Sequence, residues 1–362
     1  MMLYAITGLF FMLLPGTFLG VWNLFSISGR HGVSIPAPWI QAHGHAQIFG
    51  WIGTFIMGIG FYSVPKMAGR AASSFARGFT AWLLWMSGTL LRWAAGVYQW
   101  HWRALLPISA VLELCAFLIF LQSVRQHPPR GSNHARQPVP TWILSVLLGT
   151  FGFGASLLVN LAGTLYVARS TESPAFPGAF EMRLLALLAY AFIVPTIWGF
   201  SARWLPVFLG LKAIHERALR LALLISIAGV VLAMTGLLHT APWLFAAAAA
   251  ISVYAFHLFE PPERAAKTAG VHRSFPVFIR IAYAWLLFAT ALGIAAAYFD
   301  HANGWVGASR HALTVGFIST MVFSVGQRVL PGIRRYENLI QPAAYVSVSR
   351  AVERGLHPAC QQ

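Results

Sequence analysis

The sequence predicts an all-α, polytopic membrane protein, a bundle of about ten transmembrane helices. The composition is 58% hydrophobic and only 9% charged, which a water-soluble domain could not bury. Apolar runs recur along the whole chain, and each is long enough to cross a hydrocarbon layer of about 30 Å. The alternating segments of about ten residues that mark a β-barrel are absent. Helices are therefore expected, because they satisfy their own backbone hydrogen bonds in lipid.

The first twenty residues, MMLYAITGLFFMLLPGTFLG, have neither a basic start nor a small-residue cleavage site. We interpret them as the first span and not as a removable signal. Residues 1–332 are expected to form a single transmembrane domain, and residues 333–362, which are too polar to span, a cytoplasmic tail. The expected spans are 2–25, 39–65, 75–98, 104–124, 140–168, 183–209, 217–238, 241–259, 276–299 and 309–332.

The basic residues predict the orientation of these spans. Most of the 25 Lys and Arg residues fall in segments that would share one side of the membrane, which are 66–77, 125–139, 203–220, 260–280 and the tail from 328. The positive-inside rule makes that side cytoplasmic, with both termini inside and the chain in a bacterial inner membrane. The net charge of +16 then reflects topology and contact with anionic lipid headgroups, and nucleic acid is not expected as a partner.

An internal repeat singles out two histidines. Residues 45–65, HAQIFGWIGTFIMGIGFYSVP, align without a gap with residues 311–331, HALTVGFISTMVFSVGQRVLP. A third, weaker copy ends at residues 199–206 and has Ala186 where the histidine would stand. Duplication of a helix explains the shared glycines and prolines. It explains His45 and His311 less well, because an ionisable residue inside a span is costly and rare.

Helical geometry separates the two histidines of the first copy. At about 100° per residue, Gly50, Thr54 and Gly58 form a small-residue seam for close helix packing. His45 lies opposite that seam, above Phe49, and His43 is rotated by about 200° from His45. The two imidazoles are therefore expected to serve two sites, or one site and one structural hydrogen bond.

Neutral imidazole is a good ligand for haem iron, copper or zinc. Because the residues below His45 and His311 form an apolar wall, we predict that these two histidines hold a haem b from both sides. His43 is a further candidate metal ligand, at a copper-like site. The alternative for each histidine is an interfacial ring that reaches headgroup water.

Three charged residues inside or beside the spans are further candidates. Arg92 and Arg103 could pair with a haem propionate or an acidic substrate through their planar forks, or could snorkel or cap a helix end. Glu113 could relay protons or pair with a neighbouring helix.

Two stretches resemble motifs of the NnrS family. The first, HGHAQIFGWIGTFIMGIGFYSVPKMAG, resembles the family's opening motif H-A-H-E-M-L-F-G with a later V-P. The second, RHALTVGFISTMVFSVGQRV at residues 310–329, resembles its later H-A-L-T-V-G segment that ends in an arginine, here Arg328. The matched histidines are His43, His45 and His311.

The resemblance implies an inner-membrane protein that contains haem and copper and is tied to nitric oxide metabolism and nitrosative stress. We expect Arg92 and Arg328 to contact its cofactor.

The opening motif is also similar to the second helix of haem–copper oxidase and nitric oxide reductase catalytic subunits. Their low-spin haem ligands lie on helices two and ten, where His45 and His311 stand in this chain. The sequence has Ala46 in place of the acidic residue of the NnrS motif, and it lacks the ligand set of an oxidase-type binuclear centre. The matched residues therefore do not predict a particular reduction reaction, and whether the protein is an enzyme stays open.

We predict an NnrS-like haem- and copper-binding protein with nitric oxide and a respiratory electron donor as partners. Two alternatives stay open. One is a multi-pass transporter, which repeats and glycine-rich helices also permit. The other is an assembly factor that holds haem or copper only briefly. A red preparation favours a haem protein, and a colourless, metal-free preparation favours a transporter.

Overall fold

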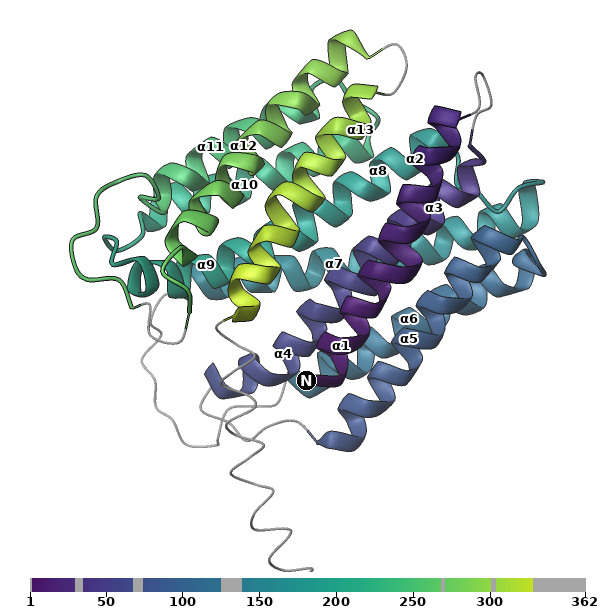
Figure 1. Ribbon diagram of the computed structural model, residues 1–362, viewed down its shortest axis with the longest axis horizontal. Helices are drawn as coiled ribbons and strands as arrows, with labels where there is room; N and C mark the ends of the chain where they lie inside the picture. Colours follow the sequence, from purple (N-terminus) through teal and green to yellow (C-terminus); the bar gives the residue numbers. More distant parts are fainter. Residues whose placement is uncertain are drawn as a thin grey trace, which may run out of the picture.

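The computed structural model describes residues 2–29, 35–67, 74–124, 139–267, 271–300 and 304–327. Within these ranges the elements are all helical, which confirms the predicted class (Figure 1). They are α1 (Met2–Phe11), η1 (Met12–Phe18), α2 (Leu19–Gly29), α3 (Ala37–His45), η2 (Ala46–Gly53), α4 (Thr54–Met67), α5 (Phe75–Tyr98), α6 (Trp102–Val124), α7 (Thr141–Ser170), α8 (Gly178–Leu187), η3 (Leu188–Ile193), α9 (Val194–Leu209), α10 (Glu216–Met234), α11 (Ala241–Ala255), α12 (Phe275–Phe299), α13 (Gly304–His311) and η4 (Ala312–Ser319).

Joined end to end, these elements make ten continuous helical stretches within the described ranges, one at each expected span. Seven of them are long and apolar enough to cross a membrane: Met2–Ser26, Ala37–Pro65, Trp102–Val124, Thr141–Ser170, Gly178–Leu209, Glu216–Met234 and Phe275–Phe299. The other three are α5, which carries two arginines, α11, which has only 15 residues, and the last helix, which begins with the polar stretch GWVGASRH. The chain is therefore a multi-pass helical membrane protein by length and composition.

Consecutive helices pack side by side. α5 contacts α6, α6 contacts α7, and α7 contacts α9, whereas α10, α11 and α12 form a second group. In Figure 1 the purple and blue helices α1 to α6 occupy one half of the bundle and the green helices α10 to α12 the other. The last helix, residues 304–327, packs on α12.

Four π-helical segments interrupt the α-helices. η2 begins directly after His45 and η4 directly after His311, and both end at aligned positions of the repeat, Gly53 and Ser319. η3 lies in the weaker third copy, one residue inside the equivalent limits at each end. A π-helical turn accommodates an extra residue and is frequent at functional sites. These segments were not expected from the sequence, and they rotate the residues below them relative to those above.

The small-residue seam of the second span packs against the first helix, in agreement with the sequence. A Cβ atom on Gly50 would lie 2.6 Å from Cδ1 of Phe11, and one on Gly58 would lie 2.6 Å from Cβ of Tyr4. Thr54, between the two glycines, is fully buried. This close packing directs the opposite face of the second span, with Ile52 and Ile56, toward the interior of the bundle.

Gly210 joins two loops at one end of the bundle. It ends α9 with a φ of +70°, the left-handed conformation that a glycine adopts without strain. Its carbonyl accepts hydrogen bonds from the backbone N–H groups of Glu263, at 2.9 Å, and Arg264, at 3.2 Å. A Cβ atom at this position would lie 2.0 Å from the carbonyl oxygen of Arg264, so only glycine fits.

Candidate functional site

His43 and His311 are brought together from opposite ends of the chain. Their ring centroids lie 6.5 Å apart, and their ring planes differ by 19°. His43 lies in the last turn of α3, and His311 is the last residue of α13. The His311 ring is exposed and the His43 ring is half-buried, so the pair lies at the edge of the packed bundle.

Hydrogen bonds fix the tautomer of both rings. Nδ1 of His43 lies 2.9 Å from the carbonyl oxygen of Gly16, and Nδ1 of His311 lies 2.9 Å from the carbonyl oxygen of Gly307. A carbonyl oxygen only accepts, so each Nδ1 carries the hydrogen and donates it. In a neutral imidazole this leaves the lone pair on Nε2. A backbone carbonyl on the other ring nitrogen is the arrangement that orients histidines that bind metals.

Gly20 leaves the space in which the His43 ring packs. A Cβ atom on Gly20 would lie 2.7 Å from Cε1 of the His43 ring, which requires glycine at this point of α2. The first helix therefore contributes both the carbonyl that holds the His43 ring and the space that the ring occupies.

His45 faces away from this pair and is buried. Its Nε2 lies 2.7 Å from Oε1 of Glu113 in α6. Its ring stacks on Phe49 with centroids 4.3 Å apart, the neighbour that helical geometry predicts. The ring beside His311 is thus that of His43, whereas the sequence led us to expect His45 there. The separation of His43 and His45 into two environments agrees with the sequence.

Glu113 connects His45 to a second helix. Its Oε2 accepts a hydrogen bond of 3.4 Å from the side-chain amide of Asn160 in α7. All three side chains are buried. Gly88 makes room for the carboxylate, since a Cβ atom there would lie 2.8 Å from Cγ of Glu113. Sequence reasoning singled out Glu113 but missed Asn160, whose only signal is a lone amide in the apolar run SLLVNLAG.

Arg92 is buried beside this network, with 5% of its surface exposed. Its guanidinium lies 4.5 Å above the ring centroid of Phe176 and within electrostatic range of Glu113 and Glu181. Among the described residues, its Nη1 has no hydrogen-bond partner. A buried guanidinium with an unused donor can bind an acidic group, because its planar fork matches a carboxylate.

The other candidate residues have simpler roles or lie elsewhere. Arg103 caps the C-terminal end of α7, with its Nη1 and Nη2 donating to the carbonyls of Ala168 and Thr171 at 2.9 and 3.0 Å. Arg328 lies outside the described residues. The ranges that the structure covers hold no cluster of three or more His, Cys, Asp or Glu side chains suited to a metal ion. A metal held by the described residues would thus have at most two ligands from this set.

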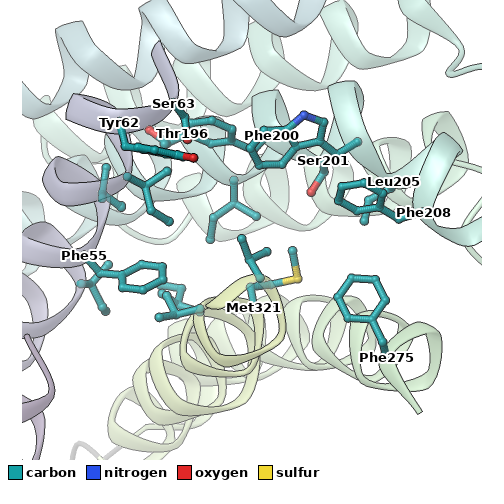
Figure 2. Close-up of a pocket in the computed structure, with 18 residues that line it drawn as sticks. Phe55, Tyr62, Ser63, Thr196, Phe200, Ser201, Leu205, Phe208, Phe275 and Met321 are labelled. Atoms are coloured by element: carbon teal, nitrogen blue, oxygen red, sulfur yellow. The ribbon is translucent and has the colours of Figure 1, made fainter. Parts of the chain in front are cut away.

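An apolar cavity of about 440 Å³ lies further along the same helices (Figure 2). Aligned positions of the three repeat copies line it, and its walls otherwise include Tyr62, Ser63, Ser201, Trp204, Leu205, Phe208 and Phe275. The aligned sets are Phe55, Thr196 and Met321; Ile56, Ile197 and Val322; and Ile59, Phe200 and Val325. The cavity is therefore located where the three helices that carry these aligned segments meet.

The protein is thus a multi-pass helix bundle with a candidate metal centre. Two oriented imidazoles lie at one level of the bundle, and the apolar cavity lies at another. The comparison with known families agrees with this class. A family model described as NnrS protein matches residues 2–337, and the chain belongs to the NnrS family. No protein with a curated description and no solved structure matches the chain.

Proposed function

We propose that this NnrS-family chain binds a haem b, and copper as a second metal, in a bacterial inner membrane and acts in nitric oxide metabolism or the response to nitrosative stress. Membership of the family supports the haem, the copper and the link to nitric oxide. The observation that carries the site is the pair of oriented imidazoles of His43 and His311. We assign these two residues as ligands of the same metal.

The geometry of the pair supports this assignment. Two imidazoles that bind one metal ion would have ring centres up to about 6 Å apart, since each metal–nitrogen bond is about 2.0–2.1 Å. The ring centroids of His43 and His311 are separated by 6.5 Å. Haem iron suits a site with two protein ligands, because the porphyrin supplies four further nitrogens, and copper is also well served by imidazole. Such a group would supply electron transfer.

The residues around the pair have defined tasks in this proposal. The carbonyls of Gly16 and Gly307 keep the hydrogen on Nδ1, so that Nε2 is the ligating atom. Arg92 is proposed to bind an acidic group of the cofactor through its unused Nη1, and Arg328 keeps the same proposed role by its match to the family motif. His45 remains a proposed ligand by that match, but its Nε2 would first have to leave Glu113.

We further propose ten spans with both termini in the cytoplasm, and an ancient duplication of the second and last helices. The ten helical stretches within the described ranges and the aligned positions of η2 and η4 support these proposals. The polar tail after residue 332 and the orientation rest on the charge distribution alone.

The experiment is a haem and metal analysis of the detergent-solubilised full chain. We expect a Soret band in the wild type and its loss in His43→Ala and His311→Ala. His239→Ala is the matched control, because its Nδ1 is likewise bound to a backbone carbonyl, that of Ala297, at 2.8 Å. An unchanged Soret band in His311→Ala removes the ligand assignment. A wild-type preparation without haem or metal favours the transporter alternative.

His45→Ala distinguishes the two assignments of the second ligand. If His43 is the ligand, this variant keeps its Soret maximum and loses thermal stability, because Glu113 loses its partner. If His45 is the ligand, the Soret band disappears in His45→Ala and is retained in His43→Ala.

A further inference from the structure

We propose that the cavity between the three repeat helices binds a membrane quinone, with Ser201 as hydrogen-bond donor to a carbonyl oxygen of the quinone ring. This inference goes beyond the metal site and uses none of its residues.

The lining excludes a charged ligand. No Asp, Glu, Lys, Arg or His side chain is among the residues that line the cavity within the described part of the chain. Burying an unpaired charge there would be costly. The volume of about 440 Å³ lies within the range of small-molecule sites, about 300–1,000 Å³. The occupant is therefore a neutral molecule that dissolves in the bilayer, since the cavity lies within the spanning segments.

The walls fit a flat ring. Phe200 lies on one wall with Thr196 and Ser201, and Phe55 and Met321 lie on the facing wall (Figure 2). Aromatic rings and a thioether above and below a planar ligand make favourable contacts. A flexible saturated chain alone would need neither the aromatic walls nor a polar group.

Ser201 provides the polar group. Its hydroxyl oxygen accepts a hydrogen bond of 2.7 Å from the hydroxyl of Tyr283, a fully buried residue of α12 behind the wall. The hydroxyl hydrogen of Ser201 has no acceptor in the part of the chain that the structure describes. In Figure 2 its oxygen points into the cavity. A hydroxyl that already accepts a hydrogen bond is a stronger donor, so Ser201 is prepared to donate to a carbonyl oxygen.

Of the three aligned copies, only the third has a serine at this position. Gly60 and Gly326 occupy the aligned positions in the other two copies. At Gly60 a Cβ atom would lie 2.7 Å from two ring carbons of Phe120, which excludes a serine there. The copy that lacks the histidine thus has a hydroxyl at a position where the other two copies have glycine. A neutral, planar, lipid-soluble molecule with carbonyl oxygens is a quinone, and this class fits every feature of the cavity.

The test is isothermal titration of the detergent-solubilised full chain with decylubiquinone at a fixed detergent concentration. Decylbenzene is the matched probe, because it has the same tail and a six-membered ring but no carbonyl oxygen. We expect saturable binding of decylubiquinone and at least about tenfold weaker binding of decylbenzene. Equal binding of the two probes would overturn the proposal and leave a site for acyl chains.

Three variants localise the interaction. Ser201→Ala, or Ser201→Gly if the first variant does not fold, is expected to bind decylubiquinone about fivefold more weakly, the effect of one neutral hydrogen bond. Ile197→Trp should abolish binding by filling the cavity. Ser252→Ala is the control, because Ser252 is buried in α11 and donates to Ala249 within its own helix. Unchanged affinity in the Ser201 variant contradicts the role of Ser201 as donor, and unchanged affinity in Ile197→Trp contradicts binding in this cavity.

The readouts are independent of the metal site. Ser201→Ala should keep the Soret band, and His311→Ala should keep quinone binding. A protein that lacks haem but binds decylubiquinone would therefore refute the proposed function and leave this inference standing.

Discussion

The two ends of the helices that carry the aligned segments differ in the contacts that hold them. At the histidine end, buried polar groups from distant helices pair with one another, as His45 does with Glu113. At the cavity end, the helices meet mostly through apolar side chains around an open space, with one buried hydrogen bond between Tyr283 and Ser201 in a wall, and the ion pair of Lys212 with Glu260 lies on surface loops. Buried polar pairs fix one geometry, because any shift leaves a group unsatisfied. Apolar contacts tolerate changes in volume, so this difference suits a rigid metal site and an adaptable ligand cavity.

The largest effect is expected at the histidine end, from Glu113→Leu. This variant leaves the imidazole of His45 and the amide of Asn160 without their partner inside the bundle. Breaking a buried pair in this way costs about 3–5 kcal/mol. The thermal unfolding midpoint of the detergent-solubilised protein should fall steeply. Glu172→Gln, at an exposed position, is the control and should leave the midpoint unchanged. An equally small change in Glu113→Leu would show that the buried network does not stabilise the histidine end of the bundle.

A smaller effect of opposite sign is expected at the cavity end, from Ile197→Phe. The larger ring enters existing space and should stabilise the protein by about 0.5–1 kcal/mol, as other cavity-filling changes do. Ile193→Phe is the matched control one turn earlier, where the side chain is 1% exposed and does not line the cavity. There the same enlargement should cost about 1–3 kcal/mol. Equal losses in the two variants would mean that the cavity end is packed as tightly as the rest.

The smallest effect is expected from the loop cluster of Glu260. Hydrogen bonds from His257, at 2.7 Å, and Lys212, at 3.0 Å, hold the pKa of the Glu260 carboxyl below its usual value, and the same contact raises the pKa of Lys212. A carboxyl with a lowered pKa stabilises the fold above its usual pKa, and this contribution is lost as the pH falls through the lowered value.

The measurement compares the unfolding midpoints of the wild type and Glu260→Gln at pH 7 and pH 3. The small difference at pH 7 should shrink at pH 3, where the wild-type carboxyl also approaches protonation. The stabilisation that comes from the raised pKa of Lys212 is complete at pH 7. It is lost only when the pH rises through that raised pKa. A difference that grows toward low pH would show that this contact does not contribute. Added salt should reduce the effect, since all three groups are near solvent.

The fold was largely predictable from the sequence, and the site only in part. Apolar length determined where each helix lies, so all ten expected spans contain a helix within the described ranges. The stacking of His45 on Phe49 followed from helical spacing alone. The partner of His311 did not, because it depends on which face of the second span is turned toward the last helix. Only the packing of the bundle determines that face, and it brings His43, not His45, to His311.

The same limit applies to Ser201 and Glu113. The sequence shows a serine where the other copies have glycine, but not the tyrosine from a distant helix that stands behind it. It likewise shows a carboxylate inside a span, but not the depth at which His45 lies next to it. Both contacts join residues more than sixty positions apart, and local patterns contain no information about such distances.

The π-helical segment after His311 has a consequence for insertions and deletions. Such a segment behaves as a single added residue that the helix has absorbed without a break. Loss of one residue between 312 and 319 is therefore expected to restore ordinary pitch and to leave His311 on the same face of the helix, because the extra residue and the wider turn cancel. Insertion of a second residue there, without further widening, would turn the upstream part by about 100° about the helix axis. His311 would then swing away from His43, although the side chains of the cavity could stay where they are. We therefore predict that the metal site survives a deletion of one residue in this segment and is lost on an insertion, while the cavity survives both.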